Sequence, residues 1–199
     1  MHLEQLRPRS PTAKPVALVG LPGSGKSSVG RQLARRLVVD FTDSDSVIEQ
    51  RIGEPIRSFF EREGEARFRD IEQEVLAELC RGGRSGVLAT GGGAVLREAN
   101  RRVLHDHATV IYLRSSPEEL QRRLRHDTQR PLLQVRDPRA KLQQLYRERD
   151  PLYVETAHFA IDTGRPTVPT LVGMILMQLE LAGLVDPSRV PSPVVPPAG

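Results

Sequence analysis

Residues 20–27 read GLPGSGKS and follow a short apolar run at residues 16–19. The octapeptide matches the pattern G-x-x-x-x-G-K-[ST], in which glycines let successive backbone N–H groups surround a phosphate. Lys26 would add a mobile positive charge beside the β- and γ-phosphates, and the Ser27 hydroxyl can bind Mg²⁺. A helix is predicted after the loop, and its positive N-terminal end would face the same phosphates. The sequence therefore predicts a nucleotide-binding site.

A second cluster is the tripeptide Asp43-Ser44-Asp45, which directly follows a predicted strand. In open α/β sheets, ligands bind at the carboxyl ends of the strands. One carboxylate could help to hold hydrated Mg²⁺, while the other could accept a proton from an attacking hydroxyl. The alternative is that Asp45 only caps the helix that follows, although both roles can coexist.

Two further patterns indicate a small anionic ligand. Three glycines at residues 91–93 follow another predicted strand, which indicates either close approach of a ligand to the backbone or a tight turn. Arg69 and Glu72 lie one helical turn apart, so the carboxylate could orient the arginine to bind a carboxylate ligand in two-point contact. Taken alone, that pair is better interpreted as an ordinary surface ion pair.

The elements that must position these residues follow an α/β pattern with a parallel sheet, because short β-branched runs alternate with longer helical segments. We expect five strands, at residues 16–19, 38–42, 87–90, 109–113 and 159–162. In the N-terminal half, the first predicted helix has Val29, Leu33 and Leu37 on one face, the second begins at a capping box of Ser46 and Glu49, the third ends at Gly64, and the fourth covers residues 65–80. In the C-terminal half, one predicted helix begins at a capping box of Ser116 and Glu119, and another covers residues 139–149 before Pro151. The last predicted helix runs through Leu171, Ile175 and Leu179.

The composition is that of one ordinary globular domain, with 38% hydrophobic and 27% charged residues and a net charge of +4. We expect a flexible leader at residues 1–14, a packed domain at residues 15–184, a mobile arginine-rich lid at about residues 125–139, and a disordered proline-rich tail at residues 185–199. The single cysteine, Cys80, is expected to be buried and excludes an internal disulfide. No run is apolar enough to span a membrane, so we expect a cytoplasmic protein without membrane or nucleic-acid partners.

Taken together, the motifs resemble those of the shikimate kinase family. The resemblance covers residue 16 to about residue 180 and comprises the phosphate loop, D-x-D at residues 43–45, F-R-x-x-E at residues 68–72, the glycine triplet, R-P-L-L at residues 130–133 and R-x-P-L-Y at residues 149–153. It implies a three-layer P-loop kinase fold with a mobile lid. It also implies transfer of the γ-phosphate of ATP to the 3-hydroxyl of shikimate, with one Mg²⁺ ion and a monomeric enzyme.

The resemblance also assigns roles to individual residues. The catalytic set would be Lys26, Arg130 and Asp45, where Asp45 orients and deprotonates the 3-hydroxyl. The metal would lie at Ser27 and Asp43. ATP would be held by Gly23, Ser24, Gly25, Lys26, Ser27, Ser28 and Arg130, with Arg123 and Arg165 beside the adenine. Shikimate would be bound by Asp45, Gly91, Gly92, Gly93 and the two carboxylate-binding arginines, Arg69 and Arg149, with Gly92 donating its N–H. Leu124 departs from the family pattern, which often has a small polar residue there, and the long tail has no family counterpart.

Two alternatives belong to other classes. A gluconate kinase would also bind a substrate with a carboxylate and hydroxyls, but the two arginine motifs and the glycine triplet favour shikimate. A regulatory sensor domain could keep this fold without catalysis, yet Lys26, Asp45 and Arg130 are all present and no DNA-binding module is apparent.

Overall fold

The computed structural model describes residues 12–82, 85–124 and 137–191 of the 199-residue chain. Its strands form one parallel sheet in the order β2-β3-β1-β4-β5. They are β1 (Val16–Val19), β2 (Asp40–Asp43), β3 (Gly86–Ala89), β4 (Thr109–Arg114) and β5 (Phe159–Asp162). The predicted α/β fold with a five-stranded parallel sheet is confirmed.

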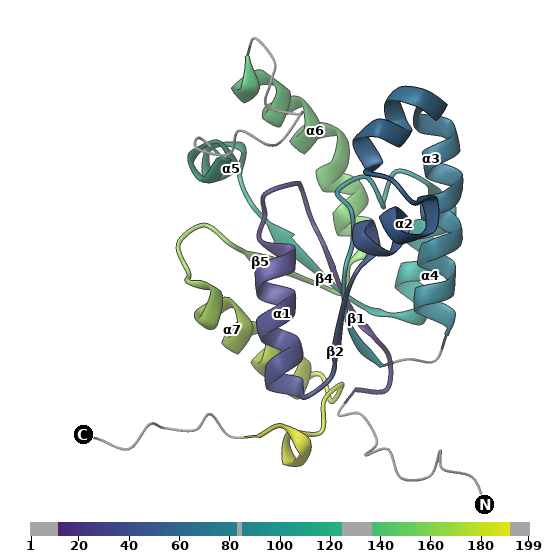
Figure 1. The fold of residues 1–199 in the computed structure, drawn as a ribbon. Coiled ribbons are helices and arrows are strands. Elements are labelled where there is room, and N and C mark those ends of the chain that lie inside the picture. Colours follow the sequence, from purple (N-terminus) through teal and green to yellow (C-terminus); the bar gives the residue numbers. More distant parts are fainter. Residues whose placement is uncertain (1–11, 83–84, 125–136, 192–199) are drawn as a thin grey trace, which may run out of the picture.

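Helices cover both faces of the sheet (Figure 1). They are α1 (Lys26–Leu37), α2 (Ser44–Ile52), α3 (Ile56–Arg81), α4 (Glu98–His107), α5 (Pro117–Leu124), α6 (Pro138–Thr156) and α7 (Val168–Leu181). In β1, Val16 and Leu18 pack with α1 and α7, whereas Ala17 and Val19 face the layer of α3, α4 and α6. Burial on both faces explains why this strand is apolar at every position.

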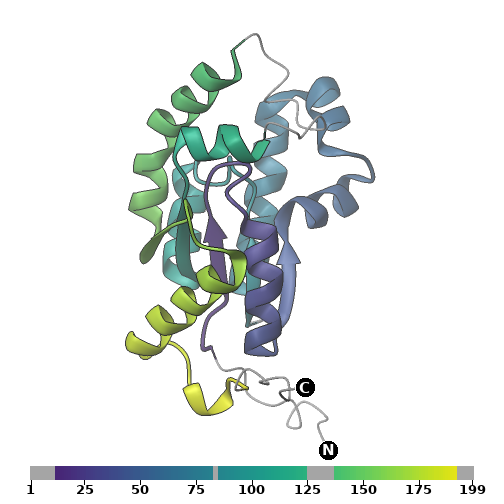
Figure 2. The same cartoon turned by 90° about the vertical axis from the view of Figure 1, so that its left-hand side faces the viewer.

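A smaller apolar cluster joins α2 to α3 beside the carboxyl ends of the strands (Figures 1 and 2). It consists of Ile48, Phe59, Phe68, Ile71 and Val75. The predicted break at Gly64 lies inside α3, where this glycine has a non-helical backbone with φ 82°. The cluster packs the second half of α3, which carries Arg69 and Glu72, against α2.

Two boundaries differ from the predictions, and a third agrees. Strand β2 begins at Asp40 rather than residue 38, because Val38 ends α1 in a left-handed conformation with φ 55°. Helix α2 is capped by Asp43, whose side chain accepts a hydrogen bond from the Asp45 N–H, so the capping box predicted at Ser46 is wrong. The capping box at Ser116 and Glu119 is confirmed by reciprocal hydrogen bonds.

Helices α6 and α4 differ from the predictions. Helix α6 continues through Pro151 to Thr156, although the proline removes one backbone donor. Tyr153 is fully buried behind it, and this tertiary packing outweighs the local cost. Helix α4 was not predicted, because only Asn100 and Leu104 of its ten residues are buried and the sequence carries no clear apolar period.

The packed domain extends slightly beyond the predicted range of 15–184. Thr12 forms an isolated antiparallel bridge with Val185, and both residues are buried. The tail begins with a 3₁₀ turn at Pro187–Arg189. Most of the predicted lid, with Arg130, lies outside the described residues, while Asp137 to Arg139 begin α6. No helix in the described ranges has the length and apolar character that a bilayer-spanning segment needs.

Candidate active site at the carboxyl ends of the strands

The phosphate loop connects β1 to α1. Gly25 caps α1 in a left-handed conformation with φ 95°, which a residue with a side chain rarely adopts. The Lys26 ammonium folds back over the loop and donates to the carbonyl oxygens of Gly20 at 2.8 Å and Leu21 at 2.9 Å. The first turn of α1 contains no acidic residue, so its N-terminus keeps its positive end for an anion.

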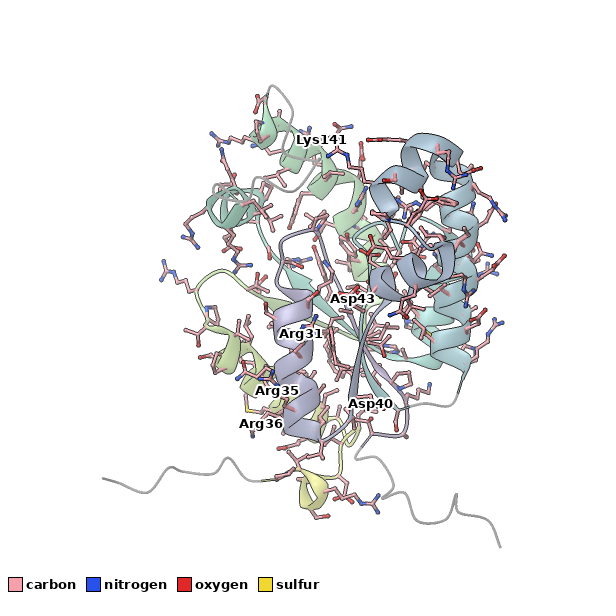
Figure 3. All side chains as sticks on the ribbon, in the orientation of Figure 1. Arg31, Arg35, Arg36, Asp40, Asp43 and Lys141 are labelled. Atoms are coloured by element: carbon pink, nitrogen blue, oxygen red, sulfur yellow. The ribbon has the colours of Figure 1, made fainter. Side chains whose placement is uncertain are left out.

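Ser27 and Asp43 are brought together as predicted for a metal site. The Ser27 hydroxyl donates to Oδ2 of Asp43 at 2.9 Å, while Oδ1 of the same carboxylate caps α2. Figure 3 places Asp43 at the carboxyl end of β2 and Asp40 at the opposite end. No cluster of three His, Cys, Asp or Glu side chains able to hold a metal occurs in the described part of the chain. A hydroxyl and one carboxylate suit Mg²⁺, which takes its other ligands from phosphates and water.

Asp45 lies beside Gly91 of the glycine triplet, close to the charges of Asp43, Glu72 and Lys26. A Cβ placed on Gly91 would lie 2.6 Å from Oδ1 of Asp45, so only glycine fits beside this carboxylate. Burial, followed by repulsion from Asp43 and Glu72, raises the pKa of Asp45 to about 6, although Lys26 acts in the opposite direction. A carboxylate with this pKa is ionised at neutral pH and is a better proton acceptor than an ordinary aspartate.

Arg69 and Glu72 form a buried pair, which decides against a surface ion pair. Nη1 of Arg69 lies 2.6 Å from Oε2 of Glu72, and the Glu72 side chain is only 1% exposed. Burial raises the pKa of Glu72, and Arg69 opposes that shift. The Arg69 guanidinium also lies over the rings of Phe68 and Phe60. Nε and Nη2 of Arg69 also donate to the exposed Glu65, at 3.3 and 3.2 Å, so a buried and an exposed carboxylate together orient the guanidinium.

The glycine triplet is the surface on which these groups converge. A Cβ on Gly93 would overlap the Arg69 guanidinium, and one on Gly92 would lie 2.7 Å from Cδ of Pro22 in the phosphate loop. Arg149, from α6, donates through Nη1 to the Gly92 carbonyl at 3.1 Å. Arg69 and Arg149 therefore reach the same loop from distant parts of the chain.

Arg149 is incompletely paired. Its Nε is buried without a hydrogen-bond partner among the described residues. A buried unpaired N–H of a charged group is costly, so such a group is expected to bind a ligand.

The residues expected beside the adenine differ in their surroundings. Arg123 donates to the Ser24 carbonyl at 3.4 Å and to the Thr163 hydroxyl at 3.2 Å, so it joins the phosphate loop to the end of β5. Arg165 is exposed in the loop after β5. Leu124 packs against the phosphate loop, since a Cβ on Gly23 would lie 2.9 Å from its methyl groups. The family departure at Leu124 therefore has a structural role in this chain.

Two residues of the site had no predicted role. Ser44 is buried and accepts a hydrogen bond from the Gly91 N–H at 3.1 Å, and Tyr153 donates to the Gly92 carbonyl at 2.6 Å. Both lie inside motifs that were recognised, D-x-D and R-x-P-L-Y. Their partners are backbone atoms of the glycine triplet, and no spacing in the sequence reveals such contacts.

A phosphate loop after β1, in a parallel sheet of this strand order, defines a P-loop kinase fold. The model of the family "Shikimate kinase" matches residues 22–180. A shikimate kinase of Paracidovorax citrulli is 59% identical over 87% of this chain and 96% of its own length. A shikimate kinase of Ralstonia nicotianae is 55% identical over 89% of this chain and 93% of its own length.

Among solved structures, shikimate kinase from Acinetobacter baumannii in complex with shikimate has a TM-score of 0.81 and 43% identity. The match covers 88% of this chain and 97% of that one. The chain belongs to the shikimate kinase family and is an ATP-dependent kinase. This membership decides against both the gluconate kinase and the regulatory sensor domain.

Proposed function

We propose that this edge of the sheet transfers the γ-phosphoryl group of ATP in line to the 3-hydroxyl of shikimate, with Asp45 as the general base. The observation that carries this assignment is the Asp45 carboxylate, held between Lys26 and the glycine triplet with a pKa of about 6. The hydroxyl proton passes to Asp45, the new P–O bond forms at the 3-oxygen, and the bond to the β-phosphate oxygen breaks to release ADP.

The phosphate end of the site is assigned to the loop and its flanking cations. The backbone N–H groups of residues 23–28 and the Lys26 ammonium would hold the phosphates, and Arg130 would approach the same charge from the lid. Ser27 and Asp43 would hold Mg²⁺, supported by their 2.9 Å contact. When bound, the ion neutralises charge on the phosphate oxygens.

The acceptor end is assigned to the two arginines on the glycine triplet. Arg69 is oriented by Glu72, and Arg149 has a buried Nε left to donate, so both guanidiniums can bind the carboxylate of shikimate. The glycines allow the hydroxylated cyclohexene ring of shikimate to approach the backbone closely. Arg123 and Arg165 would border the adenine; a monomeric state and a cytoplasmic location stay predictions from the sequence.

A direct test is a coupled assay of ADP formation with shikimate, gluconate and nucleoside monophosphates as acceptors. Of these acceptors, we expect only shikimate to be phosphorylated. We expect D45N to keep ATP binding and to lose nearly all phosphoryl transfer. Wild-type rates in D45N, together with loss of transfer in D43N, would reverse the roles given to the two aspartates.

A further inference from the structure

Tyr153 occupies a position that the proposed mechanism leaves unexplained. It lies one helical turn after Arg149 in α6, and its hydroxyl donates to the Gly92 carbonyl at 2.6 Å. Arg149 donates to the same oxygen at 3.1 Å. A carbonyl oxygen has two lone pairs, so this contact joins α6 to the glycine triplet through both.

The Tyr153 ring is held rigidly behind this contact. The residue is fully buried, and its ring stacks on Tyr112 of β4 with 4.9 Å between the ring centroids. Tyr112 is in turn fixed by a hydrogen bond of 2.8 Å from its hydroxyl to Asp150. The Tyr153 hydroxyl therefore projects from the sheet and α6 with little freedom to turn.

The glycine triplet needs such external support, because three glycines have no side chains and high conformational freedom. Ser44 holds the Gly91 N–H at 3.1 Å, and the Ala94 N–H donates to the Gly91 carbonyl at 3.1 Å. The next peptide, between Gly92 and Gly93, is held at its carbonyl by Tyr153 and Arg149. These bonds determine how the triplet faces Asp45 and Arg69.

We propose that Tyr153 is a positioning residue for shikimate binding, whose hydroxyl keeps the Gly92–Gly93 peptide and α6 in register when Arg149 turns to the substrate carboxylate. The inference rests on the carboxylate role proposed for Arg149. Arg149 can leave the Gly92 oxygen only if another donor remains there, and Tyr153 makes the shorter contact with that oxygen. Burial raises the pKa of Tyr153 well above its usual value, so the hydroxyl stays a donor at every physiological pH.

The test compares Y153F with Y112F in the full-length enzyme. Both variants keep the stacked rings, and each removes one hydroxyl hydrogen bond from a fully buried tyrosine. We expect similar losses of thermal stability. Only Y153F should raise the KM for shikimate, by roughly 5- to 10-fold, as for one lost hydrogen bond, with the KM for ATP changed less than about twofold.

A double-mutant cycle with R149A separates positioning from general destabilisation. If Tyr153 acts by freeing Arg149 from the Gly92 oxygen, Y153F should add little to the effect of R149A on shikimate binding, whereas a purely structural role would add its full effect. Assays well below the melting temperature of the least stable variant keep unfolding out of the comparison. An unchanged KM for shikimate in Y153F, or an equal rise in Y112F, would overturn the inference. If R149A loses shikimate binding while Y153F keeps its KM, the positioning role of Tyr153 is overturned and the carboxylate role proposed for Arg149 stands.

Discussion

Ser27 and Asp43 are joined by a hydrogen bond of 2.9 Å between the first turn of α1 and the end of β2. The same Asp43 carboxylate caps α2 through its other oxygen, so the helix that carries Asp45 starts from the residue beside the phosphate loop. A substitution at Asp43 is therefore expected to affect Mg²⁺ binding directly and the position of Asp45 indirectly.

D43N should raise the Mg²⁺ concentration needed for half-maximal activity by about 10-fold or more, because the amide keeps the helix cap and loses the charge. Titration of activity with Mg²⁺ at saturating ATP and shikimate measures this. D40N is the matched control, since Asp40 is exposed at the opposite end of the same strand (Figure 3). Equal Mg²⁺ requirements in D43N and wild type would remove Asp43 from the metal site.

K26A should lower kcat by on the order of 10²-fold or more, because a cation is lost where charge develops on the phosphoryl group. Shikimate affinity, measured by calorimetry without nucleotide, should change little, since Lys26 contacts the carbonyls of its own loop. K14A, which removes an exposed lysine at the other end of the sheet, serves as the control. Near-normal turnover in K26A would contradict the catalytic role of the loop.

The pH dependence should report Asp45. Because its pKa is about 6, kcat/KM for shikimate is expected to fall with decreasing pH below 6, about tenfold per pH unit. Initial rates from pH 5 to pH 8 test this prediction. A profile that stays flat down to pH 5 would exclude a base with the assigned pKa.

The same shift predicts a stability change of known sign. The folded state binds the Asp45 proton more tightly than the unfolded state, whose pKa is near 3.8, so the ionised group destabilises the fold above pH 6. D45N should therefore be more stable than wild type at pH 7.5, by up to about 3 kcal/mol, and this gain should disappear as the pH falls from 6 to 4. Urea unfolding of both proteins at pH 7.5 and at pH 4 measures this difference in stability. A D45N variant less stable than wild type at pH 7.5 would contradict the raised pKa of Asp45.

R69A and R149A should each lower kcat/KM for shikimate by roughly 30- to 1000-fold, since each leaves a desolvated carboxylate short of a charge-assisted partner. R69K should recover only part of the loss, because an ammonium lacks the planar fork. Apparent affinity for ATP should change less in R69A than in R149A, because Arg149 lies in α6, the helix that follows the predicted lid in the chain. R102A, which removes an exposed arginine paired with Glu98 in α4, provides the control. A specificity constant within a few-fold of wild type in R69A would remove the main support for the carboxylate clamp.

Much of the fold could be predicted because its signals are local. The apolar run at residues 16–19, the break at Gly64 and the capping box at Ser116 depend on residues close in the sequence. Helix α4 and the continuation of α6 through Pro151 depend instead on packing against distant elements. Local propensity does not contain that information.

The same division holds in the site. Residues with charged or glycine-rich motifs, such as Lys26, Asp45 and Arg69, could be selected from type and spacing. The depth of Glu72, which makes its pair with Arg69 a buried one, and the contact of Tyr153 with Gly92 could not, because both arise from the third dimension. The sequence also favoured Ser46 as a cap, whereas the first favourable acceptor along the chain, Asp43, takes that place.

The bridge between Thr12 and Val185 means that the packed domain begins and ends at one place, near the amino end of β1 and away from the carboxyl edge (Figure 1). A chain whose ends adjoin can be joined there by a short linker and reopened in a surface connection. The domain is therefore suited to circular permutation, and to insertion as a whole into a loop of a host protein, with its reaction site facing away from the junction.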